Sequence, residues 1–411
     1  MASFTSPTST DGPPPPITNQ KNAIPAPIDA THLTHTLAPH PRPVPSAATI
    51  AASPTTICTD HMILASWNHA TGWSAPALQP YAPLSLPPTA SCLHYATTCF
   101  EGLKAYRGDD NRLRLFRLLR NCARLGRSAA RVALPAPDPL QLAALVRALL
   151  VVDAGRWLPA ASPGGDGGGR DRFLYVRPTL VGTQAQLGVQ RPTEALLFIV
   201  ASYMPALDAP AGGLRLQTSP ANAIRAWPGG FGHAKVGANY GPTVAATQEA
   251  ALQGFGQVFW LYGEEDWCTE AGGSNFFVVW RRRDGVVEVV TAPLGDGLIL
   301  DGVTRGSCLE LVRERLGGQV EVVERRFGIK EVVEAGEEGR LLECFVAGTA
   351  WFICAVSQIR HRGHDIHIGM GPQGNGGEIT TKIKGWLSDI MYGRVEHEWA
   401  EVVPEAAKRE E

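Results

Sequence analysis

The arrangement of apolar segments along this chain most constrains its fold. Strand-like and helix-like segments mix on both sides of residues 205–213, and they do not alternate as a regular β-α-β series. A regular alternation would predict one parallel sheet covered by helices, whereas a mixture of this kind is typical of α+β domains. With 411 residues, the chain is long enough for two domains. We therefore expect a two-domain α+β protein with its functional site in the cleft between the domains.

Composition shifts divide the chain into five expected parts. Residues 1–45 are rich in Pro, Ser, Thr and Ala, and such a segment cannot bury enough apolar surface to offset its chain entropy. We expect a disordered arm there. A small α/β domain over 46–204, a linker over 205–213, a large domain over 214–400 and a charged tail over 401–411 are expected to follow.

Local patterns predict the main elements of both domains. Strands are expected at Met62–Trp67, Leu113–Phe116, Phe173–Val176, Ala195–Val200, Gln257–Leu261 and Asn275–Trp280. Helices are expected over 118–132 and 140–152, from Pro242 to Gly254, and after Gly302 as far as Leu316. The Gly-rich run 162–169 is predicted to be a surface loop without a chemical role. The basic triplet 281–283 precedes Asp-Gly between two apolar segments, which favours a solvated hairpin tip over a nucleic-acid contact.

Charge, apolar runs and cysteine content also limit which partners and which cellular compartment the sequence predicts. A net charge of −2 gives no sign of a nucleic-acid partner, and no apolar run approaches the ~18–20 residues of a membrane span. Eight cysteines form no Cys-x-x-Cys pair, so we expect no metal site and read them as reduced intracellular thiols. The first 45 residues contain no arginine before Arg42, unlike a mitochondrial transit peptide. We therefore expect a cytoplasmic protein, with the mitochondrion as the alternative.

Two segments carry groups that pyridoxal 5'-phosphate chemistry requires. Lys235-Val-Gly-Ala-Asn-Tyr240 offers an amine and a phenol, and Thr269-Glu270-Ala-Gly-Gly-Ser-Asn275 offers a carboxylate. An amine forms the Schiff base with the cofactor aldehyde, a hydroxyl near the ring oxygen tunes it, and a carboxylate keeps the pyridine nitrogen protonated. One lysine taken alone is more often a solvated surface residue, so the choice depends on the surrounding sequence.

The surrounding sequence resembles the branched-chain amino-acid aminotransferases of the eukaryotic or fungal type, which are fold-type IV pyridoxal phosphate enzymes. The order and spacing match from Thr59 to about Trp399, which is more specific than any short motif. The matching segments are Thr59-Asp-His-Met62, Leu93-His-Tyr-Ala-Thr-Thr-Cys-Phe-Glu-Gly-Leu-Lys-Ala-Tyr106, Leu115-Phe-Arg117, Asn121-Cys-Ala-Arg124, Leu174-Tyr-Val-Arg-Pro178, Ile224-Arg-Ala-Trp-Pro-Gly-Gly230, Gln257-Val-Phe-Trp-Leu-Tyr-Gly263, Gly302-Val-Thr-Arg305 and Phe345-Val-Ala-Gly-Thr-Ala350.

The resemblance implies a homodimer of the D-amino-acid aminotransferase-like fold, with pyridoxal phosphate held by the large domain. It implies transfer of the amino group between Leu, Ile or Val and 2-oxoglutarate, with amino acids and 2-oxo acids as the small-molecule partners. Lys235 is the implied catalytic residue: it carries the cofactor and then acts as general base at the substrate α-carbon. Tyr240 is implied to bond the cofactor ring oxygen, and Glu270 the ring nitrogen.

Further residues match the family's phosphate site. Arg124 is implied to grip the phosphate, which suits an arginine fork. Without the resemblance, Arg124 could be one of several arginines on a wet helix face. Val303 and Thr304 are implied to bind phosphate at a helix N-terminus, where free backbone N–H groups and the helix dipole favour an anion. Thr304 could equally be an ordinary helix cap. Thr349 is implied to bond the phosphate as well.

Other matching residues belong to the implied substrate pocket. Tyr95 and the backbone N–H groups of Thr349 and Ala350 are implied to bind the α-carboxylate. Arg177 is implied to receive the distal carboxylate of glutamate within otherwise apolar walls. The wall candidates are Phe100 and Tyr175, although aromatics on strands are more commonly plain core residues.

Three positions depart from the family pattern. Gly273 replaces a threonine of vertebrate relatives, which leaves the preferred side chain open. Asp301 stands where close relatives often have proline, and a carboxylate beside a phosphate is unfavourable unless it points away or caps the helix. Trp351 replaces the first cysteine of the redox pair of mammalian members, so only Cys354 remains and we expect no thiol switch.

Residues 28–33 resemble the start of fungal homologues, which predicts that the end of the arm packs on the body.

Three alternatives remain open. One is an aminotransferase specialised for an unusual aliphatic amino acid. Another is a different fold-type IV enzyme, such as a D-amino-acid aminotransferase or an aminodeoxychorismate lyase; the chain length and the segments from Thr59 and Leu93 argue against it. The third is a non-enzymatic scaffold paralogue, against which the intact Lys235, Tyr240, Glu270 and Arg124 argue.

Overall fold

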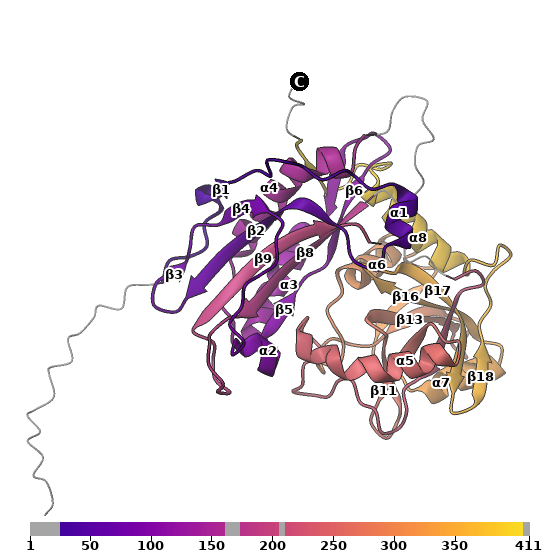
Figure 1. Cartoon of the computed structure of the whole chain (residues 1–411). Helices are drawn as coiled ribbons and strands as arrows, with labels where there is room; N and C mark the ends of the chain where they lie inside the picture. The colour runs from indigo at the N-terminus through magenta and orange to yellow at the C-terminus, as the bar shows by residue number, and fades with distance from the viewer. Residues whose placement is uncertain (1–24, 161–172, 205–209, 406–411) are drawn as a thin grey trace, which may run out of the picture.

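The chain folds into two adjoining domains, each built on its own sheet (Figure 1). The computed structural model describes residues 25–160, 173–204 and 210–405. Within these residues the first domain carries a ten-stranded sheet and the second a nine-stranded sheet. Strands and helices mix without a β-α-β series. The two-domain α+β prediction is thereby confirmed.

The first sheet is mostly antiparallel, and its strand order is β1-β4-β2-β9-β8-β6-β7-β19, with β3 beside β2 and β5 beside β8. Helices α3 and α4 bury a large aliphatic core against its central strands. The strands are β1 (Thr34–His35), β2 (Cys58–Asn68), β3 (Gly72–Trp73), β4 (Ala77–Pro80), β5 (Thr98–Phe100), β6 (Leu103–Arg107), β7 (Leu113–Phe116), β8 (Phe173–Gly182), β9 (Glu194–Ser202) and β19 (Ala400–Val403).

The second helix of that pair, α4, starts where the sequence supplies a cap. Asp138 accepts hydrogen bonds from the backbone N–H groups of Leu140 and Gln141, and Pro139 occupies the first helical position of α4. Both features stabilise a helix N-terminus because that end has unpaired donors. The helical segments of this domain are the 3₁₀ turn η1 (Ala30–His32) and the helices α1 (Ala47–Ala52), α2 (Ser91–Tyr95), α3 (Leu118–Arg131) and α4 (Pro139–Trp157).

The second sheet closes into a ring. Its order is β12-β11-β10-β17-β16-β13-β14-β15, and β12 pairs with β13 as well as with β11, while β18 lies beside β17. Closure removes the free edges of the strands that form the ring. The strands of this sheet are β10 (Leu214–Thr218), β11 (Gln257–Tyr262), β12 (Trp267–Ala271), β13 (Ser274–Arg281), β14 (Val287–Thr291), β15 (Glu321–Glu324), β16 (Leu341–Gly348), β17 (Phe352–His361) and β18 (His364–His367).

The two domains share one apolar cluster at their junction. Tyr106, Phe116 and Phe173 of the first domain pack in the same cluster as Val303 and Ile383 of the second. This shared core fixes how the domains face each other. The helical segments of the second domain are η2 (Gly237–Asn239), η3 (Gly241–Thr243), α5 (Val244–Leu252), α6 (Val303–Arg315), α7 (Ile329–Glu337) and α8 (Glu378–Met391).

The predicted elements are present, and most are longer than expected. The strand predicted at 62–67 extends over β2, and the helix predicted at 140–152 extends over α4. The helix predicted from Pro242 begins as η3 and continues as α5. Residues 282–286 connect the antiparallel strands β13 and β14, as predicted for a hairpin tip. The predicted loop 162–169 lies outside the described residues.

The chain ends differ from the expected boundaries. The charged tail is predicted to begin at residue 401, but Ala400–Val403 forms β19, which pairs antiparallel with β7 of the first domain. The described part of the expected arm, from residue 25, packs on the body, as residues 28–33 predicted: Ile28 is only 2% exposed and β1 pairs with β4. Edge-strand pairing explains both arrangements, because a β-sheet edge can order even a polar segment through its backbone. Residues 1–24 lie outside the described residues.

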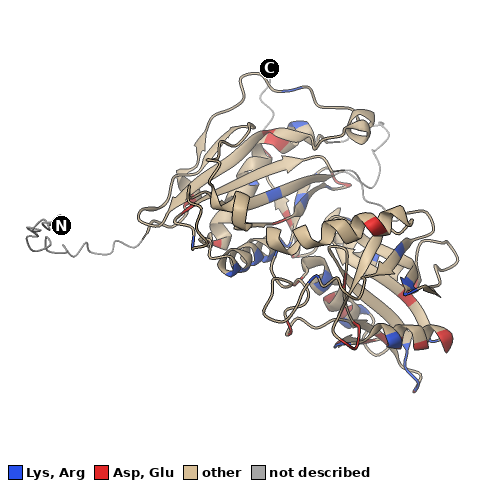
Figure 2. Ribbon diagram, turned by 60° about the horizontal axis from the view of Figure 1, so that its bottom comes forward, with Lys and Arg blue, Asp and Glu red and all other residues tan. Residues whose placement is uncertain are grey.

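Lys, Arg, Asp and Glu residues occur in both domains of the described chain. Basic and acidic positions are interspersed over both domains (Figure 2). Among the helices that the structure describes, none is both long enough and apolar enough to cross a membrane. All eight cysteines are free thiols, and seven of them are buried.

Candidate active site

A stripe of arginines on α3 marks the junction between the domains. Arginines recur at spacings of three and four residues from the N-cap of α3, so they lie on one helix face. Each has an acceptor on the second domain, but Arg120 and Arg127 remain more than half exposed, whereas Arg124 is buried. The pairs are Arg117 and Arg120 with Glu310, Arg124 with the carbonyl of Asp301, Arg127 with the Asp301 carboxylate, and Arg131 with the carbonyls of Gly229 and Gly230.

Lys235 lies between the two domains, on the segment that precedes η2. Its Nζ donates to the Tyr240 hydroxyl at 3.2 Å and lies 4.9 Å from the centre of the Phe100 ring. The Lys235 backbone is fixed on both sides, because its N–H donates to Ser128 Oγ at 2.9 Å and its carbonyl accepts from the Phe100 N–H at 3.0 Å. The amine is therefore held in a defined position.

Arg177 lies against the same Phe100 ring as Lys235. Its guanidinium carbon is 4.7 Å from the centre of the Phe100 ring, and its Nη2 donates to the Tyr175 hydroxyl at 3.1 Å. The Arg177 Nε is buried and has no hydrogen-bond partner among the described residues. Gly102 allows this packing, because a Cβ there would lie 1.8 Å from the Tyr175 hydroxyl. Four of the predicted residues, Lys235, Phe100, Tyr175 and Arg177, are thus contiguous.

Glu270 is buried at the end of β12, with only 3% of its surface exposed. Its Oε1 accepts from the Leu300 backbone N–H at 2.8 Å and from Asn275 Nδ2 at 3.0 Å. Its Oε2 lies 3.1 Å from Arg225 Nη2. Arg225 also reaches Asn239 Oδ1 at 3.4 Å, and Asn239 directly precedes Tyr240. The carboxylate is therefore tied to the segment that carries the lysine.

A small cavity brings together three of the four residues predicted to bind the phosphate. Val303, Thr304 and Thr349 line it, together with Gly348 and with Asn121 of α3. Val303 is the first residue of α6, and the N-cap Gly302 supplies no side-chain hydrogen bond. The first backbone N–H groups of a helix lack acceptors within the helix, so they favour an anion at this position.

Arg124 is buried beside this cavity in a bidentate pair with Glu101. Its Nε and Nη2 donate to the two carboxylate oxygens at 2.7 and 2.8 Å, and Asn121 Nδ2 donates to the same carboxylate at 2.9 Å. Glu101 is completely buried. Burial raises the pKa of Glu101, but the charge and hydrogen bonds of Arg124 outweigh it, so the pKa lies below its usual value. The carboxylate therefore remains ionised and orients the guanidinium.

Glu101→Gln is expected to lower the free energy of unfolding at neutral pH by roughly 3–5 kcal/mol, because it leaves Arg124 as a buried uncompensated charge. The control Glu401→Gln affects a pair with Arg147 in which the side chains are 36% and 33% exposed, and it is expected to cost at most about 1 kcal/mol. Because the pKa of Glu101 is lowered, its stabilisation should be present at neutral pH and lost as the pH falls through that pKa. Urea unfolding of both variants from pH 7 downward measures this, and equal losses in both would contradict it.

The structure shows the surroundings of Asp301 and Gly273, two residues that depart from the family pattern. The Asp301 carboxylate pairs with Arg127 at 2.9 Å and has 53% of its side chain exposed, so it points away from the cavity. A Cβ at Gly273 would have the Tyr240 ring as its nearest neighbour, at 3.8 Å, so the missing side chain leaves space beside that ring. Cys354 is fully buried.

Tyr95 is the predicted site residue that the contacts do not join to the others. It ends α2, with 37% of its surface exposed. Its ring lies beside that of His94, with the ring centres 6.1 Å apart. Ala350 follows Thr349 in the turn after β16, and its carbonyl accepts from Lys104 Nζ at 3.3 Å.

Sequence reasoning missed Glu101, Arg225 and Asn275 as partners of the predicted residues. All three lie inside recognised motifs: Glu101 in the Phe-Glu-Gly segment, Arg225 in the segment from Ile224 and Asn275 at the end of the segment from Thr269. No local signal indicated which side chain each would contact. Within the described residues, no group of three or more His, Cys, Asp or Glu side chains is placed to hold a metal ion.

Most of this chain is similar to known proteins. Residues 98–359 match the model of the family described as Amino-transferase class IV. The mitochondrial branched-chain-amino-acid aminotransferase of Schizosaccharomyces pombe is 40% identical, over 90% of this chain and 84% of that protein. The cytosolic enzyme of the same name from Mus musculus is 42% identical, over 84% of this chain and 86% of that protein.

The fold agrees as well. The crystal structure of a branched-chain aminotransferase from the thermophilic archaeon Thermoproteus uzoniensis, with norvaline, matches 85% of this chain and 100% of that chain, with 24% identity and a TM-score of 0.63. The family model covers more than half of the chain, and both relatives named above are well above 30% identity. This chain therefore belongs to the class IV aminotransferases and, within them, to the branched-chain-amino-acid aminotransferase family.

Proposed function

We propose that this protein is a pyridoxal phosphate-dependent transaminase that moves the amino group between Leu, Ile or Val and 2-oxoglutarate. The observation that carries the proposal is the group formed by Lys235, Phe100 and Arg177. A held amine and a guanidinium with an unpaired donor lie against the same aromatic ring. A base and a carboxylate receptor that share an apolar wall suit both an aliphatic amino acid and glutamate.

The residues present fit the cofactor. Its dianionic phosphate would be held by the backbone N–H groups of Val303 and Thr304, by Thr349 and by Arg124, which together line or border one cavity. Glu270 would accept from the ring nitrogen, since its Oε2 has only the Arg225 contact among the described residues. Tyr240 would bond the ring oxygen. When bound, the cofactor ring withdraws electrons from the substrate α-carbon and so acidifies its proton.

Lys235 is proposed as the group that binds the cofactor covalently and then moves the α-proton. Tyr240 holds Nζ at 3.2 Å, and the Phe100 ring lies against the amine. A base must lie within hydrogen-bond reach of the proton that it removes, and a fixed backbone keeps it there. The backbone N–H groups of Thr349 and Ala350, with Tyr95, are proposed to bind the α-carboxylate.

The proposed activity is tested by direct assay. Purified protein loaded with cofactor should form glutamate from 2-oxoglutarate at least about tenfold faster with Leu, Ile or Val than with aromatic or D-amino acids, the scale of a difference of ~1.4 kcal/mol. D-Alanine and aminodeoxychorismate serve as the substrates of the other fold-type IV enzymes. Turnover of either in preference to leucine would replace the proposed substrate class.

Arg177→Met is expected to weaken glutamate and 2-oxoglutarate far more than leucine. Loss of one charge-assisted contact is worth about 1.5–3 kcal/mol, which corresponds to roughly a tenfold to hundredfold change in kcat/KM ratio. Leucine makes no ionic bond at that end, so kcat/KM for leucine should fall only a little. Tyr175→Phe is the matched control for Arg177→Met, because it removes only the hydroxyl that accepts from Arg177 and keeps the guanidinium. Parallel losses for leucine and glutamate, together with a lower melting temperature, would show that Arg177 only braces the first domain.

A second candidate is a transaminase for an unusual aliphatic amino acid. The space beside the Tyr240 ring at Gly273 favours it, because a bulkier side chain could enter there. A panel of 2-oxo acids of increasing length and branching, assayed with glutamate as donor, separates it from the first proposal. Preference for a longer or more branched acid over the 2-oxo acids of leucine, isoleucine and valine supports the second candidate.

We further propose a cytoplasmic homodimer. The relatives named above include one mitochondrial and one cytosolic enzyme, so they do not discriminate between the compartments. Imaging of the full-length protein tagged at its C-terminus decides the location. Sedimentation equilibrium decides the assembly: a mass near 44.0 kDa, the mass of one chain, would exclude the dimer.

A further inference from the structure

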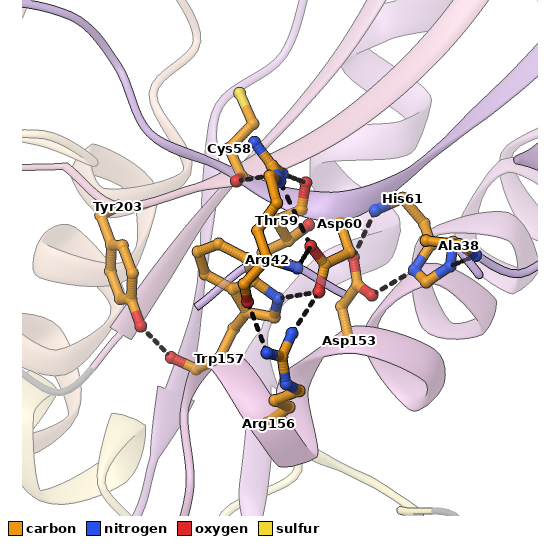
Figure 3. A network of polar contacts seen from close by, with 10 residues as sticks. All are labelled: Ala38, Arg42, Cys58, Thr59, Asp60, His61, Asp153, Arg156, Trp157 and Tyr203. Carbon is orange, nitrogen blue, oxygen red and sulfur yellow. Dashed lines mark hydrogen bonds and ion pairs between the residues drawn. The ribbon is translucent and has the colours of Figure 1, made fainter. Parts of the chain in front are cut away.

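Arg42, in the expected N-terminal arm, is bound into a polar network at the start of β2 (Figure 3). Its Nε lies 3.2 Å from Asp60 Oδ1, and its Nη2 donates to the carbonyls of Cys58, at 2.8 Å, and Thr59. Its backbone N–H also donates to Asp60 Oδ1, at 3.0 Å. The guanidinium lies 5.5 Å from the centre of the Trp157 ring. One arm residue therefore makes several simultaneous contacts with one strand end.

Asp60 is the centre of this network. Its side chain is only 4% exposed, and its Oδ2 accepts from Arg156 Nη1 at 2.6 Å and from Trp157 Nε1 at 2.9 Å. Burial alone raises the pKa of Asp60, but the hydrogen bonds of Trp157 and Arg42 and the charge of Arg156 lower it below its usual value. Release of Arg42 would leave Asp60 Oδ1 without its partner, although Arg156 and Trp157 would still bind Oδ2, so the release is unfavourable.

A second contact holds the arm just before Arg42. The Ala38 N–H donates to His61 Nε2 at 2.9 Å, and His61 Nδ1 lies 2.6 Å from Asp153 Oδ1. Because Nε2 accepts a hydrogen bond, the ring proton belongs on Nδ1, where it is donated to Asp153. The chain is thus tied to the β2 and α4 layer at two nearby points (Figure 3).

The contact between Arg42 and Cys58 closes a loop. Residues 43–57 connect Arg42 to Cys58, the first residue of β2, so the contact between Arg42 and Cys58 joins the two ends of this segment. Within this loop, α1 (Ala47–Ala52) has no buried residue, so no core of its own holds it in place. The ends of the loop are also held through the backbone, because the Arg42 carbonyl accepts from Arg156 Nη2 and the Ile57 carbonyl accepts from the Tyr203 N–H at 2.9 Å. The guanidinium of Arg42 adds the side-chain contacts that bring the two ends together.

This loop forms one wall of a cavity beside the predicted substrate site. The cavity measures about 400 Å³ and is lined by Ile50 and residues 53–58 on one side and by Tyr175, Arg177 and Ser202 on the other. Arg177 is the guanidinium that lies against Phe100, next to Lys235. The loop wall combines apolar side chains with the hydroxyls of residues 53, 55 and 56. Movement of the loop would open the distal end of the site to water.

We propose that Arg42 is a positioning residue: by closing the loop 43–57 it holds the wall beside Arg177 and thereby tightens the binding of amino-acid and 2-oxo-acid side chains. The proposal rests on the transaminase function for its substrates. Arg42 acts through the loop and touches neither the lysine nor the predicted phosphate residues.

The test replaces Arg42 by Met, which keeps the aliphatic stem over Trp157 but removes all the guanidinium hydrogen bonds. Arg42→Lys restores one charge and serves as the rescue variant. Arg360→Met is the matched control, because Arg360 also pairs with a carboxylate, Asp365 at 2.6 Å, and lies 5.0 Å from the Phe255 ring centre, but in the second domain. Hydrogen exchange is measured over residues 43–57, together with KM, kcat and the affinity for 4-methylpentanoate, a non-reacting acid of leucine shape.

In Arg42→Met, amide exchange across 43–57 should accelerate at least about tenfold, and KM for leucine and the dissociation constant of 4-methylpentanoate should rise about tenfold. The kcat value should stay within about twofold, with partial recovery in Arg42→Lys and no change in Arg360→Met. Unchanged exchange would overturn the loop closure, and faster exchange with unchanged affinity would overturn the binding role. Because exchange and 4-methylpentanoate binding need no turnover, they remain decisive even if the wild-type protein fails to transaminate.

Discussion

Lys235→Ala is expected to abolish multiple-turnover transamination. Nζ of Lys235 is held at 3.2 Å from the Tyr240 hydroxyl, and we propose it as both the attachment point of the cofactor and the base at the α-carbon. Loss of a positioned general base alone costs about 10²–10⁴-fold in rate. The covalent link is lost as well, so the total effect should exceed that range. Borohydride treatment of the variant, followed by mass spectrometry, should find no cofactor attached to the protein.

Two controls separate chemistry from folding. Lys235→Arg keeps the charge but cannot act as a base near neutral pH, and it should be as inactive as the alanine variant. A small primary amine added to Lys235→Ala should restore part of the proton transfer, because the space left by the side chain can admit it, whereas Lys235→Arg should show no rescue. A cofactor adduct that persists in Lys235→Ala would assign the attachment to another residue.

Glu270→Gln is expected to keep the cofactor bound but slow proton abstraction on the order of 10²-fold, the scale found when a preorganised group at a developing charge is removed. A neutral amide cannot stabilise a protonated ring nitrogen. The variant also leaves Arg225, now 3.1 Å from the carboxylate, without its charge partner. The measurement is the single-turnover rate with leucine, compared with the rate for α-deuterated leucine. The isotope effect should increase as proton transfer becomes the slow step.

A matched buried carboxylate controls for stability. Glu288 lies on β14 of the same domain, is 4% exposed and accepts from Trp280 Nε1 on the adjacent strand β13. Glu288→Gln should therefore share any general cost of changing a buried acid while leaving the single-turnover rate unchanged. If Glu270→Gln reacts as fast as Glu288→Gln, Glu270 does not act on the cofactor ring.

Much of the second domain could be predicted because its signals are local. The segment from Lys235 to Tyr240 spans six residues, so the amine and the phenol that bonds it are close in sequence as well as in space. The N-terminus of α6 follows from Gly302 and the apolar helix after it, and the hairpin tip at 282–286 follows from turn chemistry. Short-range patterns of this kind predict contacts well because groups that are close in sequence are brought together by the backbone itself.

The pairing of charges could not be predicted in the same way. Arg124 and Glu101 are 23 residues apart, and Arg225 lies far from Glu270 along the chain, yet each pair is within 3.1 Å. Several arginines on or beside α3 were equal candidates for the phosphate by sequence alone. Their partners distinguish them, because Arg117 is bound by a partly exposed carboxylate of α6, whereas Arg124 is held beside the cavity by a fully buried one. A guanidinium fixed by such a pair can orient a ligand.

The sequence by itself predicted the chemistry of this protein, because the lysine, phenol and carboxylate stand in segments whose order and spacing resemble a known family. Only the tertiary structure decided where the C-terminal strand pairs and which partners complete the site. Val402 and Val403 join β7 because the first sheet has an edge there, and Arg42 closes the loop beside Arg177 because Asp60 is buried. Such contacts depend on surfaces that exist only after the domains have formed, so no local pattern encodes them.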